Sequence, residues 1–236
     1  MKKGKKLHGN KETVVKVCNW LSLPLQALGC CILYLVIEAF SRHSLASAWS
    51  YMVESPWVFL YNAFLIFTTF MVVYLFRRRV LVRLVMSCFW LLLGIINGVI
   101  LANRVTPFTG PDLRNLSDGA KVVTKYLSKG TMILVAAALV ALLAFFVWVW
   151  IKGPKFQGKI RWYLNVPLIA LVIVLFTGAT NLALAKRVLS SYFVNIAFAY
   201  QDYGYPYCLA VTLFDTGISE PNGYSCLLYT SPSPRD

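Results

Sequence analysis

The sequence predicts an all-α membrane protein, and three observations lead to this fold class. Hydrophobic residues make up 58% of the 236 residues. Charged residues make up only 14%, whereas soluble domains carry about 25%. The apolar residues also form long runs separated by short basic segments, which is the pattern of bilayer-spanning helices. Backbone N–H and C=O groups in lipid must pair within their own segment, so we expect each run to be a helix.

Five runs are long enough to cross a bilayer, and together they define a membrane domain of residues 20–185. They cover approximately residues 20–40, 57–76, 80–102, 131–151 and 164–185. The third run contains Arg83 near its start, where a long side chain can reach the membrane interface. Gly94 and Gly98 form a GxxxG pattern in the same run, which favours close contact with another helix.

The distribution of Lys and Arg predicts a cytoplasmic N-terminus, because cytoplasmic loops are enriched in these residues. With that orientation the inside segments contain fourteen Lys and Arg residues and the outside segments contain eight. The inside set includes a basic N-terminal segment, residues 1–19, and the short turn Arg77–Arg79. Five spans then place residues 186–225 outside the cell, as a juxtamembrane helix and a linker. The inverted topology is the alternative.

The charge balance indicates lipid partners. The net charge is +14 with nine acidic residues, and the basic residues flank the apolar runs. We therefore expect anionic phospholipids such as phosphatidylglycerol to be the partners, and no nucleic acid. The six cysteines form no CxxC pair, and His8 and His43 fall on opposite sides of the membrane, so no metal or cofactor site is expected in this chain.

Two outside segments have helical periodicity. In residues 106–130, Thr109 and Asp112 resemble a capping box, and apolar and basic residues then fall on different faces, which predicts an interfacial helix. This helix either only lies on the bilayer or uses its lysines to hold an anionic lipid substrate; the lysines are Lys121, Lys125 and Lys129. Residues 186–208 predict a second surface helix, broken at DYGYPYC. The segment LFDTGISEPNGYS is expected to be an extended linker.

One polar cluster suggests a lipid-headgroup pocket. Glu38 lies near the outer end of the first run, and Arg42 follows four residues later, so the two should pair on one helix face. Asn62 and Asn97 add polar groups within other runs. The cluster is either helix-end polarity with hydrogen bonds between helices, or Glu38 and Arg42 form the floor of the pocket. Arg104 is a further headgroup candidate, and no catalytic residue is assigned.

Three stretches together resemble the N-terminal membrane part of the lipoteichoic acid synthase family. They are IEAFSRHSLASAWSYMVESPWVFLYNAFLI, NRVTPFTGPDL and NIAFAYQDYGYPYCLAVTLFDTGISEPNGYS. The resemblance implies a phosphoglycerol transferase of the cell membrane of a Gram-positive bacterium, which moves glycerol phosphate from phosphatidylglycerol to a cell-envelope acceptor. It also implies an outer α/β sulfatase-like domain with a threonine nucleophile and a divalent metal, manganese. Those residues would follow Ser225, so this chain would be the anchor and lipid-presenting part and inactive alone.

The last residues, Cys226–Asp236, do not resemble the family. Their sequence, CLLYTSPSPRD, can be read from a DNA string that resembles a transposase-type sequencing adapter. We therefore expect residues 226–236 to be an artefactual tail. Two alternative functions stay open: a stand-alone small transporter or lipid scramblase, and a scaffold that recruits cell-wall synthesis proteins.

Overall fold

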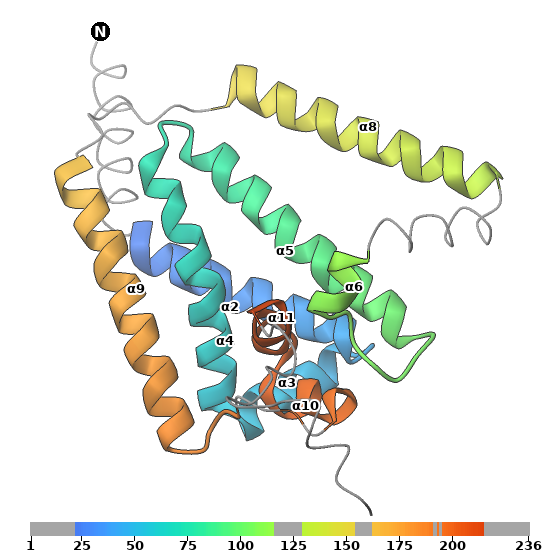
Figure 1. Cartoon of the computed structure of the whole chain (residues 1–236). Coiled ribbons are helices and arrows are strands. Elements are labelled where there is room, and N and C mark those ends of the chain that lie inside the picture. Colours follow the sequence, from blue (N-terminus) through green and yellow to red (C-terminus); the bar gives the residue numbers. More distant parts are fainter. Residues whose placement is uncertain (1–21, 116–128, 154–161, 191–192, 194, 215–236) are drawn as a thin grey trace, which may run out of the picture.

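The structure, a computed structural model, describes residues 22–115, 129–153, 162–190, 193 and 195–214, and in these ranges all regular secondary structure is helical (Figure 1). Within the described residues, four helices are long and apolar enough to cross a membrane. They are α2 (Ser22–Ser41), α4 with its 3-10 continuation η1 (Pro56–Phe70 and Met71–Leu75), α5 (Arg79–Leu101) and α9 (Trp162–Ala185). The predicted all-α class is confirmed, and these helices match four of the predicted runs to within two residues at each end.

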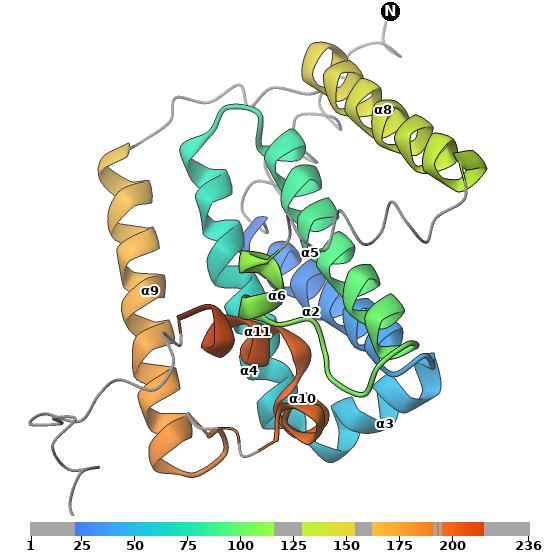
Figure 2. The same cartoon turned by 45° about the vertical axis from the view of Figure 1, so that its right-hand side comes forward.

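The predicted run 131–151 falls within α8 (Lys129–Lys152), so it is helical as expected. Figures 1 and 2 show α8 set apart from the other long helices, near them only at its C-terminal end. There Val149 is buried, and the guanidinium of Arg78 lies 5.0 Å from the ring centroid of Trp150. That α8 is a fifth span stays a prediction.

Helix α2 is the centre of the bundle, and α4 and α5 pack along it. The glycines of the GxxxG pattern allow the approach of α5. A Cβ atom at Gly98 would lie 2.8 Å from the carbonyl oxygen of Phe40, and one at Gly94 would lie 3.1 Å from the side chain of Ile37. The predicted close contact is therefore confirmed, and its partner is α2. Helix α9 is held by Asn165, which donates a hydrogen bond to the carbonyl of Tyr74 at 2.8 Å.

The described ranges also contain four short helices: the first and third in chain order lie at the end of the bundle opposite the turn between α4 and α5, and the second and fourth lie beside its middle (Figure 2). They are α3 (Leu45–Glu54), α6 (Gly110–Arg114), α10 (Ile196–Tyr203) and α11 (Tyr205–Phe214). Local chemistry fixes their ends: the Ser44 hydroxyl accepts a hydrogen bond from the N–H of Ser47 at the start of α3, and Asn195 caps α10 in the same way. Pro56 occupies the first turn of α4, where it needs no N–H partner.

The capping box predicted at Thr109 and Asp112 is confirmed at the start of α6. The described helix ends at Arg114. The continuation predicted through Lys121 and Lys125 lies outside the described residues, as does the side chain of Lys129, the first residue of α8.

The prediction for residues 186–208 is partly wrong. Residues 186–190 are not an α-helix, and α10 begins only at Ile196 because Asn195 caps it there. The expected break is present at Gly204. The chain then forms α11 as far as Phe214, so Leu213 and Phe214 are helical and are not part of an extended linker. Residues 215–225 of that linker lie outside the described part.

Replacing Gly98 with Ala should weaken the contact between α2 and α5. The added methyl group would meet backbone atoms of Phe40, which cannot move aside as a flexible side chain would, so we expect a loss of about 1–3 kcal/mol of stability. The measurement is thermal or denaturant unfolding of the purified protein in detergent.

Gly178→Ala is the matched control, because nothing lies within 4 Å of a Cβ atom at Gly178 in α9. This control should stay within about 1 kcal/mol of the original protein. Equal losses for the two variants would contradict the packing described for Gly98.

Candidate functional site

The carboxyl group of Glu38 is at the centre of a buried hydrogen-bond network. Glu38 is 0% exposed on α2. One oxygen accepts hydrogen bonds from the hydroxyl of Tyr34 at 2.9 Å and from the backbone N–H of Tyr205 at 3.1 Å. The other accepts from Nε of Arg42 at 3.0 Å, one turn later on the same helix. The predicted pairing of Glu38 with Arg42 is therefore confirmed.

Tyr205 is the first residue of α11, so Glu38 satisfies an N–H that the helix itself cannot use. The next residue, Pro206, has no N–H to satisfy. The N–H of Tyr207 donates to Oδ1 of Asn62 at 2.9 Å. Two polar side chains, one from α2 and one from α4, thus cap a helix start that is itself buried. The positive end of the α11 dipole also faces the acidic side chain, which stabilises both.

The C-terminal carbonyls of α10 are satisfied from the same side. Nδ2 of Asn62 donates to the carbonyl of Tyr203 at 2.8 Å, and Nη2 of Arg42 donates to that of Gln201 at 2.7 Å. The carbonyl of Asp202 lies 3.5 Å from the hydroxyl of Tyr51. Asn62 therefore bridges the end of one helix and the start of the next.

Gly204 makes this junction between α10 and α11 possible. Its φ of +81° lies in a region that side chains disfavour. A Cβ atom there would lie 2.3 Å from the Tyr34 hydroxyl and 2.7 Å from Nδ2 of Asn62. The backbone can approach both polar groups only because residue 204 has no side chain.

Arg42 and Tyr51 form the outer layer of this cluster. The Arg42 guanidinium lies 4.0 Å from the centroid of the Tyr51 ring, a cation–π contact. Burial, and after it the nearby Glu38 carboxyl group, raise the pKa of Tyr51. Its hydroxyl therefore keeps its proton and remains a donor.

A second set of contacts attaches the segment after α5. Asn97 is fully buried; its Nδ2 donates to Oγ of Ser41 at 2.9 Å, and its Oδ1 accepts from the N–H of Phe108 at 2.8 Å. The hydroxyl of Thr212 in α11 accepts from the N–H of Gly110 at 3.0 Å. The segment that leads into α6 is therefore bound to α5 through Phe108, α6 itself is bound to α11 through Gly110, and Thr212 is used structurally.

Arg104 and Asp112 form an ion pair at the start of α6. Arg104 also donates to the carbonyls of Thr106 and Pro107. Burial raises the pKa of Asp112, but the hydrogen bonds from Arg104 and Thr109 lower it by more, so the pKa lies below the usual range. The stabilisation from this pair is present above the usual aspartate pKa and is lost as the pH falls through the lowered one.

Two apolar grooves flank the contact between α4 and α9. The larger has a volume of about 770 Å³ and lies between α4, α5, α9 and α11. The smaller has a volume of about 690 Å³ and lies between α4 and α9, with Trp57 and Lys186 among its lining residues. Tyr61, whose hydroxyl is 2.9 Å from Oγ1 of Thr180, lines both grooves. Each volume falls in the range of small-molecule sites, about 300–1,000 Å³.

The structure brings together only part of the predicted headgroup set. Glu38 and Arg42 meet at the junction, where their polar atoms contact other groups of the chain; Arg104 belongs to the neighbouring α6 contact. A headgroup role for these residues and for Lys121, Lys125 and Lys129 stays a prediction. In the described ranges no group of three or more His, Cys, Asp or Glu side chains could hold a metal ion.

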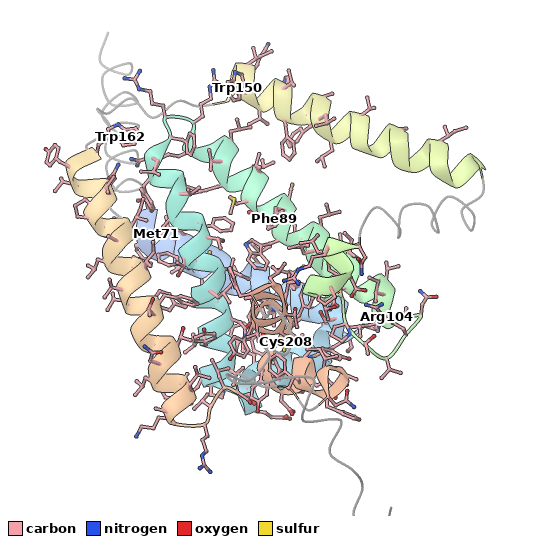
Figure 3. All side chains as sticks on the ribbon, in the orientation of Figure 1. Met71, Phe89, Arg104, Trp150, Trp162 and Cys208 are labelled. Carbon is pink, nitrogen blue, oxygen red and sulfur yellow. The ribbon has the colours of Figure 1, made fainter. Side chains whose placement is uncertain are left out.

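Sequence reasoning missed α11 and the larger groove that it lines. The signal was present in YPYCLAVTLF, an apolar stretch of ten residues that begins after a glycine. Lys186, at the smaller groove, was counted only as an orientation signal. Figure 3 shows Cys208 of α11 within the densely packed part of the molecule, and Arg104 at its edge.

Replacing Gly204 with Ala should release α11 from the bundle. The clash with Tyr34 and Asn62, together with the positive φ, should cost about 3 kcal/mol, which raises the opened fraction about a hundredfold. Cys208 is 2% exposed and reports on this opening. The measurement is the rate of maleimide labelling at Cys208, with the other five cysteines replaced by alanine.

Gly178→Ala in the same background is the control and should leave the labelling rate of Cys208 unchanged. If Gly204→Ala also left this rate unchanged, α11 would not depend on the junction.

Comparison with known proteins gives no relative for this chain. No family model matches it, and neither the curated proteins nor the solved structures that were searched contain a match. The resemblance to the lipoteichoic acid synthase family therefore stays an expectation that rests on the three stretches quoted above.

Proposed function

We propose that this chain is the membrane domain of a phosphoglycerol transferase of the lipoteichoic acid synthase type. In this proposal it anchors a catalytic domain outside the cell membrane of a Gram-positive bacterium and presents an anionic phospholipid such as phosphatidylglycerol to it. The proposal includes five spans, with α8 as the fourth, and a cytoplasmic N-terminus.

The observation that carries the proposal is the position of α11. Glu38 and Asn62 attach its first turn to the membrane helices. Its second half, with Ala210 and Phe214, lines the groove of about 770 Å³. A segment that was only a flexible tether would need no buried polar caps. A rigid helix beside an apolar groove would keep a bound lipid close to the part of the protein that follows residue 214.

The lining of the larger groove supports acyl chains as its occupant. It is almost entirely aliphatic and aromatic, with Thr68, Thr69 and Thr180 among the few polar side chains. The hydroxyls of Thr68 and Thr180 donate to carbonyls of their own helices, and that of Thr69 does the same while accepting from Trp90. An apolar chain can therefore lie in the groove without leaving a polar group unsatisfied. Lys186 lines the smaller groove and offers a cation for a phosphate there.

Filling the larger groove should remove the lipid. Ala210→Trp places a large ring where acyl methylenes would lie; each excluded methylene is worth about 0.8 kcal/mol, so losing two weakens retention roughly tenfold. The measurement is the amount of phosphatidylglycerol that stays with the purified full chain, counted by native mass spectrometry.

Val174→Trp is the matched control, because Val174 is 66% exposed on α9 and lines neither groove. It should retain phosphatidylglycerol as the original chain does. Equal retention by Ala210→Trp would contradict lipid binding in the groove.

The proposal that a catalytic domain follows this chain can be tested on the coding DNA beyond codon 225. We expect it to continue into a domain that has a threonine nucleophile and ligands for a divalent metal. Sequencing of the contiguous gene checks this. A stop codon directly after Ser225, or a following domain without metal ligands, would contradict the transferase assignment and leave the lipid-binding measurement unaffected.

A further inference from the structure

A third, smaller pocket lies between α2 and the start of α5, near the turn that contains Arg77–Arg79. Its volume is about 340 Å³. Helix α2 lines it with residues three and four apart, and α5 adds residues of its first turns. The lining residues that carry the argument are Ser22, Gln26, Gly29, Arg83, Ser87 and Phe70. Gly29 leaves space, because nothing lies within 4 Å of a Cβ atom at that position.

Gln26 is a buried donor without an acceptor. Its side chain is 6% exposed, and its Oε1 accepts a hydrogen bond from Nε of Arg83 at 3.2 Å. Its Nε2 is buried and has no hydrogen-bond partner in the described part of the chain. A buried amide N–H without a partner is costly, so such groups are usually satisfied by water or a ligand. The missing partner must be a hydrogen-bond acceptor.

Arg83 gives the pocket a positive charge. No carboxylate of the described residues lies within ion-pair distance of it. Its guanidinium is held 5.9 Å from the ring centroid of Tyr74, whose hydroxyl lies 3.4 Å from Oγ of Ser22. The guanidinium, the Gln26 amide and the hydroxyls of Ser22 and Ser87 thus offer donors around one space, a set suited to an oxoanion.

The apolar part of the lining favours a lipid phosphate as this oxoanion. Leu25, Leu33 and Phe70 line the same pocket, and Leu25 is 52% exposed on the outer surface of α2. Figure 3 shows Trp150 and Trp162 at this end of the molecule, as expected near a membrane interface. A phosphate that enters from the lipid side brings acyl chains that can cover these leucines.

We propose that this pocket binds the phosphate of an anionic phospholipid in the leaflet at the Arg77–Arg79 end of the bundle. Arg83 and the Nε2 group of Gln26 contact the phosphate oxygens, and the hydroxyls of Ser22 and Ser87 lie around it. The lipid would bridge α2 and α5 and strengthen their contact. This site shares no lining residue with the groove at α11 and does not depend on the function proposed above.

The test measures phosphatidylglycerol bound to the purified full chain by native mass spectrometry, with phosphatidylcholine as the zwitterionic comparison. All variants carry Ala210→Trp, so that the groove at α11 does not contribute. Arg83→Gln should weaken phosphatidylglycerol binding about five- to tenfold, and Gln26→Leu about threefold, as expected for lost charge-assisted and neutral hydrogen bonds. Arg83→Lys keeps the charge and should retain part of the binding, which separates loss of the site from misfolding.

Arg77→Gln is the matched control. It removes the same charge at the same end of the bundle, but Arg77 is exposed and does not line the pocket. It should change binding less than about twofold, as for a screened surface charge. Equal losses for Arg77→Gln and Arg83→Gln would overturn the site in favour of diffuse attraction to the surface. Displacement of the lipid by millimolar inorganic phosphate would overturn the lipid assignment and leave a free-anion site.

Discussion

The junction of α10 and α11 depends on one hydrogen bond, from the first N–H of α11 to the Glu38 carboxyl group at 3.1 Å. A helix start needs partners for its unused N–H groups, and burial removes water as the partner. Glu38 supplies one acceptor, Asn62 supplies the next, and Pro206 removes the need for a third. In return, the helix dipole and the Arg42 guanidinium offset the cost of placing an acidic group where it is 0% exposed.

The buried polar residues of α2, α4 and α5 follow a common rule. Glu38, Asn62 and Asn97 are each fully buried, and each bonds the backbone of a segment that follows a span. Their partners are Tyr205, then Tyr203 and Tyr207, and Phe108. The side chains therefore satisfy backbone groups at the junction of α10 and α11 and before α6, groups that are costly to bury without a partner. The three polar side chains therefore attach to the bundle the segments that follow α5 and α9.

Sequence reasoning was most successful where the signal is local. Run length located α2, α4, α5 and α9, and helical spacing paired Glu38 with Arg42, because both depend on near neighbours. Helix α11 was missed since its ten residues are too few to stand out as a span, and its caps come from residues far away along the chain. The role of Gly204 was hidden for the same reason: only the folded chain brings Tyr34 and Asn62 against it.

The long separation between Glu38 and Tyr205, 167 positions along the chain, has a consequence for biogenesis. A ribosome releases α2, α4 and α5 well before α10 and α11, so the acceptor groups are made long before their donors. Late docking of this kind is slow because a large loop must close first. If the early helices have not yet associated, α10 and α11 have no surface to dock on. They would then stay exposed to quality-control proteases until the bundle is complete.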